Sequence, residues 1–315
     1  MDKTANRNYP FDLARSICVV WIVGFWHLLN YLPSEYQLSD NALPICKGIT
    51  VSVLACFTFL SGFFLKKYEF GSIKDAIQFY KKRFWRFYPL FVVAAFSLLL
   101  CGSSLKQVLL AIVGLSVFFP PPIQTLWYFS MLILFYLMTP LLQFKTGRRL
   151  SLTLCVALLV LVLSCFYADA RLVLYFPFYV LGLNLSNKIV EKSLSGYAIF
   201  VALPVYIVML CAEIDNYFYQ FIQTLVGVVV ILSIAKSLYS PKIQAPISII
   251  AEASMCAYLF HRPFYSRIVI ALKKLTSLQA MPLLFAVLSV VLLFVFAYYT
   301  QKVYNHYIIK IQNNG

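Results

Sequence analysis

Charged residues are scarce in this chain of 315 residues. They make up 12% of it, hydrophobic residues make up 62%, and 26 Lys and Arg outnumber 11 Asp and Glu. Soluble globular domains usually carry about 25% charged residues, so this composition excludes that class. We therefore predict an integral membrane protein, with the lipid bilayer as its surroundings.

The chain also lacks the features of several other classes. Its eight cysteines include no Cys-x-x-Cys pair, and its three histidines lie far apart. The cysteines are therefore interpreted as small hydrophobic residues, and no metal is expected. The first apolar stretch is too long for a cleavable leader. Because no long polar segment is present, we expect one transmembrane domain over 1–315 with no appended soluble domain.

Long apolar runs are what the sequence does contain. A helix needs about 20 apolar residues to cross a bilayer core, and a backbone in lipid must bond to itself. Transmembrane spans are expected at 171–187 and 243–265. A triple proline at 120–122 cannot continue a helix, so it separates a span at 126–144 from a short re-entrant or interfacial piece at 107–119. The other predicted spans are 16–34, 48–65, 87–105, 150–168, 193–212, 216–235 and 275–301. The predicted fold class is an all-α, polytopic transmembrane helical bundle of about ten spans.

The basic residues set the predicted orientation. If the N-terminus is cytoplasmic, most Lys and Arg fall in cytoplasmic loops at 66–87, 145–149, 188–192 and 236–242 or near the termini, as the positive-inside rule requires. Both termini are then cytoplasmic, and we expect a multi-pass protein of the inner (plasma) membrane. These loops and anionic headgroups explain the net charge of +15, so nucleic acid is not an expected partner.

One histidine, His27, lies within the first apolar stretch. Leaving an ionisable side chain unpaired in hydrocarbon costs about a few kcal/mol, so such a residue is a functional candidate. Imidazole exchanges protons near neutral pH and suits a general base for a hydroxyl group. A histidine bonded to a neighbouring helix is the structural alternative, and both interpretations stay open. At the inner end of the same helix, Asp12 and Arg15 have the spacing of a same-face ion pair.

The densest basic segment, residues 72–88, has the composition of an interfacial helix. Arg83 and Arg86 lie three residues apart, on one face of such a helix. Two guanidinium groups on one face can hold a diphosphate bidentately. A patch that sets topology and binds lipid headgroups is the alternative interpretation.

Four sequence blocks follow one another along the chain. They read Phe-Asp-Leu-Ala-Arg at 11–15 followed by His27, Phe-Leu-Ser-Gly-Phe-Phe-Leu at 59–65, Arg-Phe-Trp-Arg-Phe-Tyr-Pro-Leu at 83–90, and Leu-Trp-Tyr-Phe-Ser at 126–130. Weaker echoes follow at 179–182 and 254–263. In this order, the blocks resemble the acyltransferase-3 family of membrane O-acyltransferases, which often acetylate bacterial surface polysaccharides.

The resemblance implies roles for four residues. His27 is implied to be catalytic, Arg15 to be essential, and Arg83 and Arg86 to form part of a cytoplasmic acyl-CoA site. The implied reaction moves an acyl group, with acetyl expected, to a hydroxyl of a surface polysaccharide or lipid-linked glycan. Acyl-CoA is then a co-substrate, and no permanently bound cofactor is expected. Direct attack by the acceptor and a transient acyl-histidine both remain open.

One spacing departs from the family pattern. The family usually has ten residues between the arginine and the histidine, whereas eleven separate Arg15 from His27 here. On a regular helix this extra residue moves the two side chains from about 20° to about 120° apart. A one-residue π-bulge restores the register, and Gly24 is a suitable place for it.

Besides Asp12, four further residues are candidates for the tunnel or the acceptor site. Trp127 and the Ser130 hydroxyl are candidate thioester contacts, with structural anchoring as the alternative. Glu252 lies inside a span and is expected to pair with Arg15 or a tyrosine. His261 is nine residues further on, which places it on the opposite helix face. It either contacts the acceptor or marks the membrane interface.

The competing interpretation from a different class is a non-enzymatic transporter or flippase. His27 and Glu252 would then be proton-relay groups. Inverted repeats would support this interpretation, but the sequence has no convincing internal symmetry. A pair of arginines at the inner surface also has no obvious purpose in such a protein.

Overall fold

The computed structural model describes residues 8–143, 170–186, 196–212, 214–273 and 282–313, and these ranges contain helices and no strand. The predicted all-α class is confirmed. The chain divides into two compact units, one made of Met1–Leu60 with Leu185–Gln301 and the other of Ser61–Asn184 with Lys302–Gly315. Each unit is described by itself.

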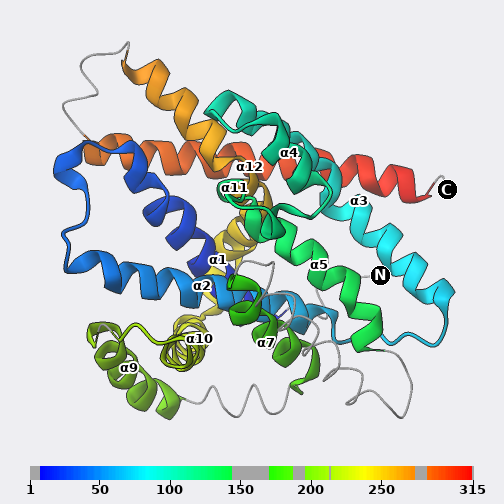
Figure 1. The fold of residues 1–315 in the computed structure, drawn as a ribbon, viewed down its shortest axis with the longest axis horizontal. Coiled ribbons are helices and arrows are strands. Elements are labelled where there is room, and N and C mark those ends of the chain that lie inside the picture. Colours follow the sequence, from blue (N-terminus) through cyan, green and yellow to red (C-terminus); the bar gives the residue numbers. More distant parts are fainter. Residues whose placement is uncertain (1–7, 144–169, 187–195, 213, 274–281, 314–315) are drawn as a thin grey trace. The chain divides into compact units, whose positions relative to one another are not determined.

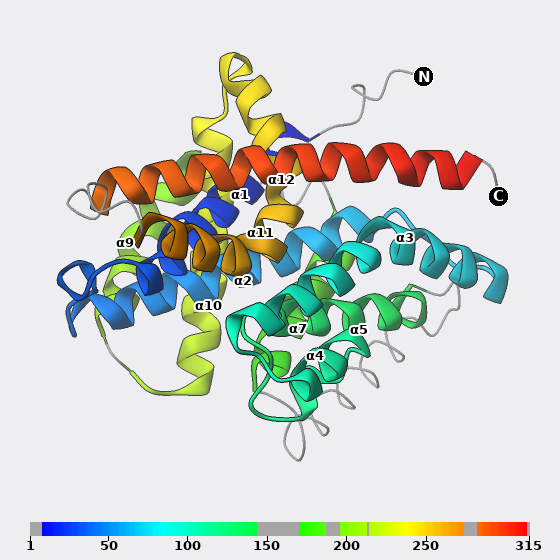
Figure 2. The same ribbon diagram turned by 90° about the horizontal axis from the view of Figure 1, so that it is seen from above.

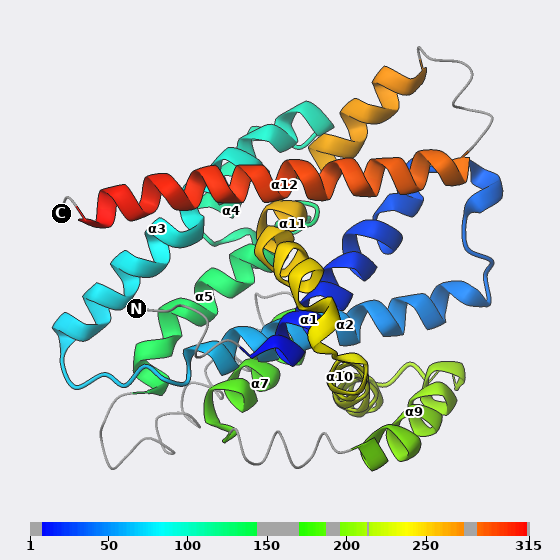
Figure 3. The same ribbon diagram turned by 180° about the vertical axis from the view of Figure 1, so that it is seen from behind.

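The first unit is built around α1, the helix that begins the described chain (blue in Figure 1). This helix packs against α10 and α11, and α10 in turn packs against α9. Figure 3, the view from behind, shows α11 crossing α1. The helical segments are α1 (Tyr9–Val19), the π-helix η1 (Val20–Trp26), the 3-10 helices η2 (Leu28–Tyr31), η3 (Ser34–Tyr36) and η6 (Pro241–Ile243), and the helices α2 (Ala42–Leu65), α9 (Gly196–Cys211), α10 (Tyr217–Leu238), α11 (Gln244–Lys273) and α12 (Pro282–Asn313). The ends of α2 and α12 belong to the second unit.

The second unit is centred on α3 and α5. These helices pack against each other and against the short α4, and α7 packs on α5 (Figure 2). The helical segments are α3 (Ile73–Ser97), η4 (Leu98–Cys101), α4 (Leu105–Ile112), η5 (Ser116–Phe118), α5 (Trp127–Leu142) and α7 (Arg171–Asn184). The short piece predicted at 107–119 is confirmed as short, because α4 has eight residues, too few to cross a bilayer.

The basic segment at 72–88 differs from its prediction as a separate interfacial helix. It forms the first part of α3, which continues without a break to Ser97. A capping box starts this helix, since the hydroxyl of Ser72 accepts from the backbone of Asp75 while the Asp75 carboxylate accepts from the backbone of Ser72. Pro89 lies inside the helix and does not end it.

Six helical segments in the described ranges are long and apolar enough to cross a membrane. They are Tyr9–Tyr31, Ala42–Leu65, Ile73–Cys101, Tyr217–Leu238, Pro241–Ile268 and Leu284–Tyr307. Two shorter apolar helices, Trp127–Leu142 and Ala198–Cys211, accompany them. The span predicted at 150–168 and the loops at 145–149 and 188–192 lie outside the described residues. The total of ten spans and the cytoplasmic termini stay predictions.

Gly62 allows the sequence block at 59–65 to pack closely against the segment at 179–182. Gly62 lies in the block at 59–65, and a Cβ atom there would overlap the carbonyl oxygen of Tyr179 and lie 3.2 Å from the amide nitrogen of Leu183. The backbones of α2 and α7 therefore touch at this glycine. The buried Tyr179 is further held by a hydrogen bond between its hydroxyl and that of Thr139 on α5.

Candidate active site

The first helix changes its winding just before His27. Residues Val20–Trp26 form a π-helix, and the amide of His27 donates to the carbonyl of Ile22, five residues earlier, at 2.9 Å. A π-turn accommodates one more residue than an α-turn. The predicted irregularity between Arg15 and His27, with Gly24 inside it, is confirmed.

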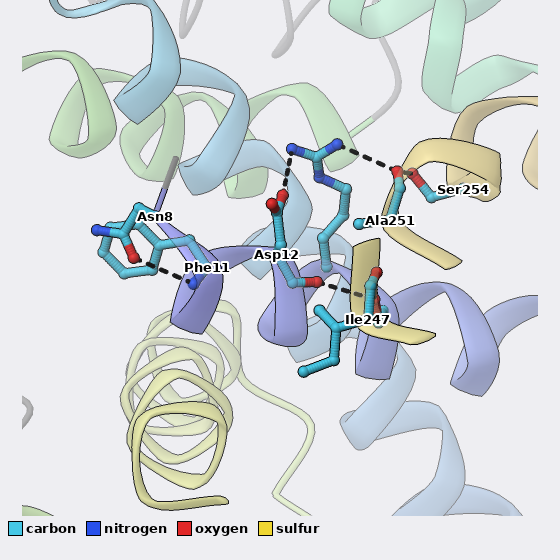
Figure 4. A network of polar contacts seen from close by, with 8 residues as sticks. Asn8, Phe11, Asp12, Ile247, Ala251 and Ser254 are labelled. Carbon is cyan, nitrogen blue, oxygen red and sulfur yellow. Dashed lines mark hydrogen bonds and ion pairs between the residues drawn. The ribbon is translucent and has the colours of Figure 1, made fainter. Parts of the chain in front are cut away.

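Arg15 connects α1 to α11. Its Nη2 lies 3.2 Å from Oδ1 of Asp12, so the predicted ion pair is confirmed. Its Nη1 donates to the carbonyl of Ala251 at 3.3 Å. In Figure 4 the Asp12 carboxylate lies on one side of this guanidinium group and the Ala251 segment of α11 lies on the other. The Ser16 hydroxyl, which donates to the Asp12 carbonyl at 2.9 Å, lies 3.4 Å from the Ile247 carbonyl.

His27 stacks on a second histidine from α11. The rings of His27 and His261 are parallel to within 1°, with centroids 4.7 Å apart. His261 is fully buried, and its Nδ1 lies 2.8 Å from the carbonyl of Tyr258. A carbonyl oxygen only accepts, so this Nδ1 carries the proton and Nε2 holds the lone pair of the neutral ring.

Two ring nitrogens of this histidine pair remain without a protein partner. Within the described residues, Nδ1 of His27 and Nε2 of His261 are buried and make no hydrogen bond. Buried polar atoms are nearly always bonded, and exceptions concentrate at functional sites. Arg15 and His27 both contact α11. With the π-helix between them, the two side chains therefore face the same neighbouring helix.

A tyrosine of α11, Tyr265, lies beside His261 and contacts a second tyrosine, Tyr31. The buried Tyr265 donates its hydroxyl to the carbonyl of Val23 inside the π-helix at 3.0 Å. Its ring lies 6.1 Å from that of His261 and 5.5 Å from that of Tyr31. Neither tyrosine was predicted from the sequence to be a site residue. One signal did exist for the histidines, since the predicted topology places His27 and His261 in the outer halves of their spans.

In the second unit, the two arginines of α3 have different surroundings. The guanidinium carbon of Arg83 lies 5.5 Å from the ring centroids of Tyr68 and Phe79 and 5.9 Å from that of Tyr136. Arg83 is half-buried and its Nε is buried without a hydrogen bond among the described residues. Arg86 is exposed. The two guanidinium groups of the predicted diphosphate grip are therefore not equivalent.

The positive charge around Arg83 affects the pKa of Tyr68, which lies in the loop before α3. Burial raises the pKa of the Tyr68 phenol, but the positive charges of Arg83, Lys82 and Lys67 and a hydrogen bond from Arg83 lower it, and the net shift is downward. The lowered pKa of Tyr68 indicates electropositive surroundings at this end of α3.

The family comparison covers both units. The acyltransferase-3 family model, described as an acyltransferase domain, matches residues 8–302. The chain belongs to this acyltransferase family. No curated protein and no solved structure gives a significant match. Together with the apolar helices of the described ranges, the match makes the chain a multi-pass membrane acyltransferase.

Two of the expected tunnel residues of this acyltransferase are engaged within the second unit. The Ser130 hydroxyl lies 3.3 Å from the carbonyls of Ala111 and Leu126, to which it donates. This is the arrangement that the anchoring alternative describes, and donation to a thioester stays a prediction. The ring of Trp127 lies 3.9 Å from the Arg171 guanidinium and stacks on Tyr175 at 6.2 Å.

Glu252 occupies a different face of α11 from the histidine of this acyltransferase. Its side chain is exposed, whereas His261 is fully buried, as the nine-residue separation predicts. The partner predicted for Glu252, either Arg15 or a tyrosine, stays a prediction. Arg15 forms an ion pair with Asp12, which belongs to its own helix and lies one turn away.

Proposed function

We propose that this membrane acyltransferase moves an acetyl group from cytoplasmic acetyl-CoA to a hydroxyl of a cell-surface polysaccharide or lipid-linked glycan, at the inner (plasma) membrane. The observation that carries the proposal is the stacked pair of His27 and His261 in a chain of the acyltransferase-3 family. An imidazole with an unpartnered nitrogen is the kind of group that takes a proton from a hydroxyl.

The reaction balances with His27 as the single proton carrier. His27 removes the proton of the acceptor hydroxyl as its oxygen attacks the thioester carbonyl. The new C–O bond forms, the C–S bond breaks, and the CoA thiolate leaves with the proton returned by the imidazolium. Two imidazolium rings with centroids 4.7 Å apart would repel one another strongly in a low-dielectric interior. The pair therefore takes up one proton at a time, as this cycle requires.

Arg15 and His261 act on His27 as positioning residues in this proposal. Arg15 fixes the inner part of α1 to α11 through the Ala251 carbonyl, and His261 supports the ring of His27 further along the same two helices. A catalytic group displaced by about 1 Å can lose about 100-fold in rate, so such supports matter. Both contacts lie within one compact unit.

The arginines of α3 supply the proposed acetyl-CoA contacts. The exposed guanidinium group of Arg86 can hold a phosphate bidentately. Arg83 adds positive charge from its half-buried position among aromatic rings. Phosphate groups are better matched by guanidinium than by ammonium geometry, so lysine is a poor substitute at either position.

Label transfer in isolated membranes tests this proposal. Membranes containing the wild type, His27→Ala or the exposed control His306→Ala are given radiolabelled acetyl-CoA and de-esterified surface polysaccharide from the producing cells. We expect wild type and His306→Ala to label the polysaccharide and His27→Ala to lose about 100-fold or more. Equal labelling by His27→Ala, or none by wild type, would contradict the proposal.

A further inference from the structure

A cavity in the first unit lies apart from the histidine pair. It has a volume of about 390 Å³ and is formed by the beginning of α2, the end of α9 and the beginning of α10. This volume falls within the range of about 300–1,000 Å³ that is usual for small-ligand sites. Its lining combines charged, amide and tyrosine side chains: Lys47, Asp215, Gln220, Gln223, Tyr217 and Tyr219.

Several polar groups of this lining have no protein partner. Within the described residues, neither Lys47 nor Asp215 forms an ion pair, and the side-chain amide of Gln220 makes no hydrogen bond. Gln223 donates its Nε2 to the Met209 carbonyl at 2.9 Å, which leaves its amide oxygen as an acceptor. The cavity thus offers donors and acceptors together, with one positive and one negative charge from the exposed side chains of Lys47 and Asp215.

The corner between α9 and α10 holds these groups in place. The Tyr219 hydroxyl also donates to the Met209 carbonyl, at 2.8 Å. The side chain of Asn216 accepts from the amides of Phe218 and Tyr219 at the start of α10. On the α2 side, a Cβ atom at Gly48 would overlap the side chain of Leu210, so α2 packs closely on α9 there. The cavity wall is therefore a built structure.

The same turn of α2 is tied to the helix that carries His27. Thr50, between the cavity residues Gly48 and Val51, accepts a hydrogen bond from Nε1 of Trp21 at 3.0 Å. Trp21 belongs to the π-helix that ends next to His27. The cavity at the beginning of α2 and the π-helix that ends next to His27 are therefore joined by a direct hydrogen bond within one compact unit.

The chemistry of the lining selects a class of ligand. A sugar hydroxyl both donates and accepts, so a polyhydroxyl compound satisfies amide, carboxylate and ammonium groups at once. The opposite charges of Lys47 and Asp215 favour a neutral ligand over an ion. Tyr217, whose side chain is 49% exposed, adds an aromatic surface suited to the apolar face of a sugar ring.

We infer that this cavity binds sugar units of the glycan acceptor, next to the catalytic helix. The inference rests on the proposed function for the identity of the ligand. It assigns Asp215, Gln220, Gln223 and Lys47 as acceptor-binding residues, whose hydrogen bonds hold the glycan while another of its hydroxyl groups reaches His27.

The test measures glycan binding in the absence of acetyl-CoA. The full chain is placed in phosphatidylcholine nanodiscs, and the Kd for de-esterified surface polysaccharide of the producing cells is measured by surface plasmon resonance. The variants are Asp215→Asn/Gln220→Leu, Lys47→Met and His27→Ala. The matched control is Phe218→Ala, since Phe218 is 72% exposed on the same turn of α10 and lies outside the lining.

We expect wild type, His27→Ala and Phe218→Ala to bind alike, and both cavity variants to bind at least tenfold more weakly. Unchanged binding by both cavity variants, or no binding by wild type, overturns the inference. Label transfer in the same nanodiscs separates the two proposals. Binding through the cavity without transfer contradicts the acetyltransferase alone, whereas His27-dependent transfer with unaffected cavity variants contradicts the cavity alone.

Discussion

The imidazole rings of His27 and His261 lie parallel, with centroids 4.7 Å apart, although their helices come from opposite ends of the chain. His261 is fixed by its own bond to the Tyr258 carbonyl, so it presents a rigid surface to the ring of His27. A fixed partner limits the orientations of a catalytic imidazole and thereby raises the fraction of productive encounters.

Replacing His261 tests this positioning role. His261→Phe keeps a flat ring but loses the anchor to Tyr258, and we expect kcat to fall about 10-fold to 100-fold with KM for acetyl-CoA unchanged. His261→Asn, which can still donate to that carbonyl, recovers part of kcat. A purely structural histidine would instead lower the thermal midpoint and the amount of folded protein, with kcat per folded molecule unaffected.

The π-helix should make activity sensitive to the number of residues between Arg15 and His27. Deleting Gly24 removes the extra residue and leaves a separation that a regular helix brings within about 20°. Inserting an alanine after Gly24 adds a second extra residue and turns His27 by about 100°. We expect the deletion to retain at least ten times more transfer activity than the insertion, at matched membrane levels. The reverse order would contradict the role assigned to the π-helix.

The Asp12–Arg15 pair makes a prediction about stability. Arg15→Met removes an ion-pair partner of the buried Asp12 carboxylate and should cost roughly 3 kcal/mol. The double variant Asp12→Asn/Arg15→Met removes the charge as well, and we expect it to be more stable than Arg15→Met alone. Thermal unfolding in detergent measures both variants and the single variant Asp12→Asn. A double variant that loses the sum of the two single effects would show that the two residues are not coupled.

The two arginines of α3 should respond differently to substitution. Arg86→Ala removes an exposed group, so we expect KM for acetyl-CoA to rise about tenfold with little change in the thermal midpoint. Arg83→Ala also removes contacts with three aromatic rings and should destabilise the protein by about 1–2 kcal/mol. Identical effects of the two substitutions on KM and stability would contradict this division of roles.

Local features of the site were predictable from the sequence. The i,i+3 spacing predicted the ion pair of Asp12 and Arg15. The extra residue before His27, counted against the usual spacing of the family that the chain resembles, predicted the π-helix. Both depend on the geometry of one helix. The stacking of His27 on His261 and the aromatic rings around Arg83 depend on which distant helices meet, and periodicity within a segment does not encode that choice.

Two other features could not be chosen from the sequence alone. The sequence left the Ser130 hydroxyl as either a thioester donor or an anchor, and the structure shows it bonded to the Ala111 carbonyl across the α4–α5 contact. The basic segment at 72–88 was expected to be an interfacial helix, and it forms the first part of α3, which runs on to Ser97 through Pro89. Which neighbour a hydroxyl reaches depends on tertiary packing, which a sequence segment does not report.

The most direct test of the account is the O-acetyl content of surface glycan from cells carrying wild type or His27→Ala at matched membrane expression. Alkaline release and quantification of acetate report the esters formed in the cell. The account predicts wild-type-dependent esters that fall to the level of a deletion strain in His27→Ala. Esters that persist in His27→Ala, or that do not depend on the wild-type protein, would contradict a catalytic His27.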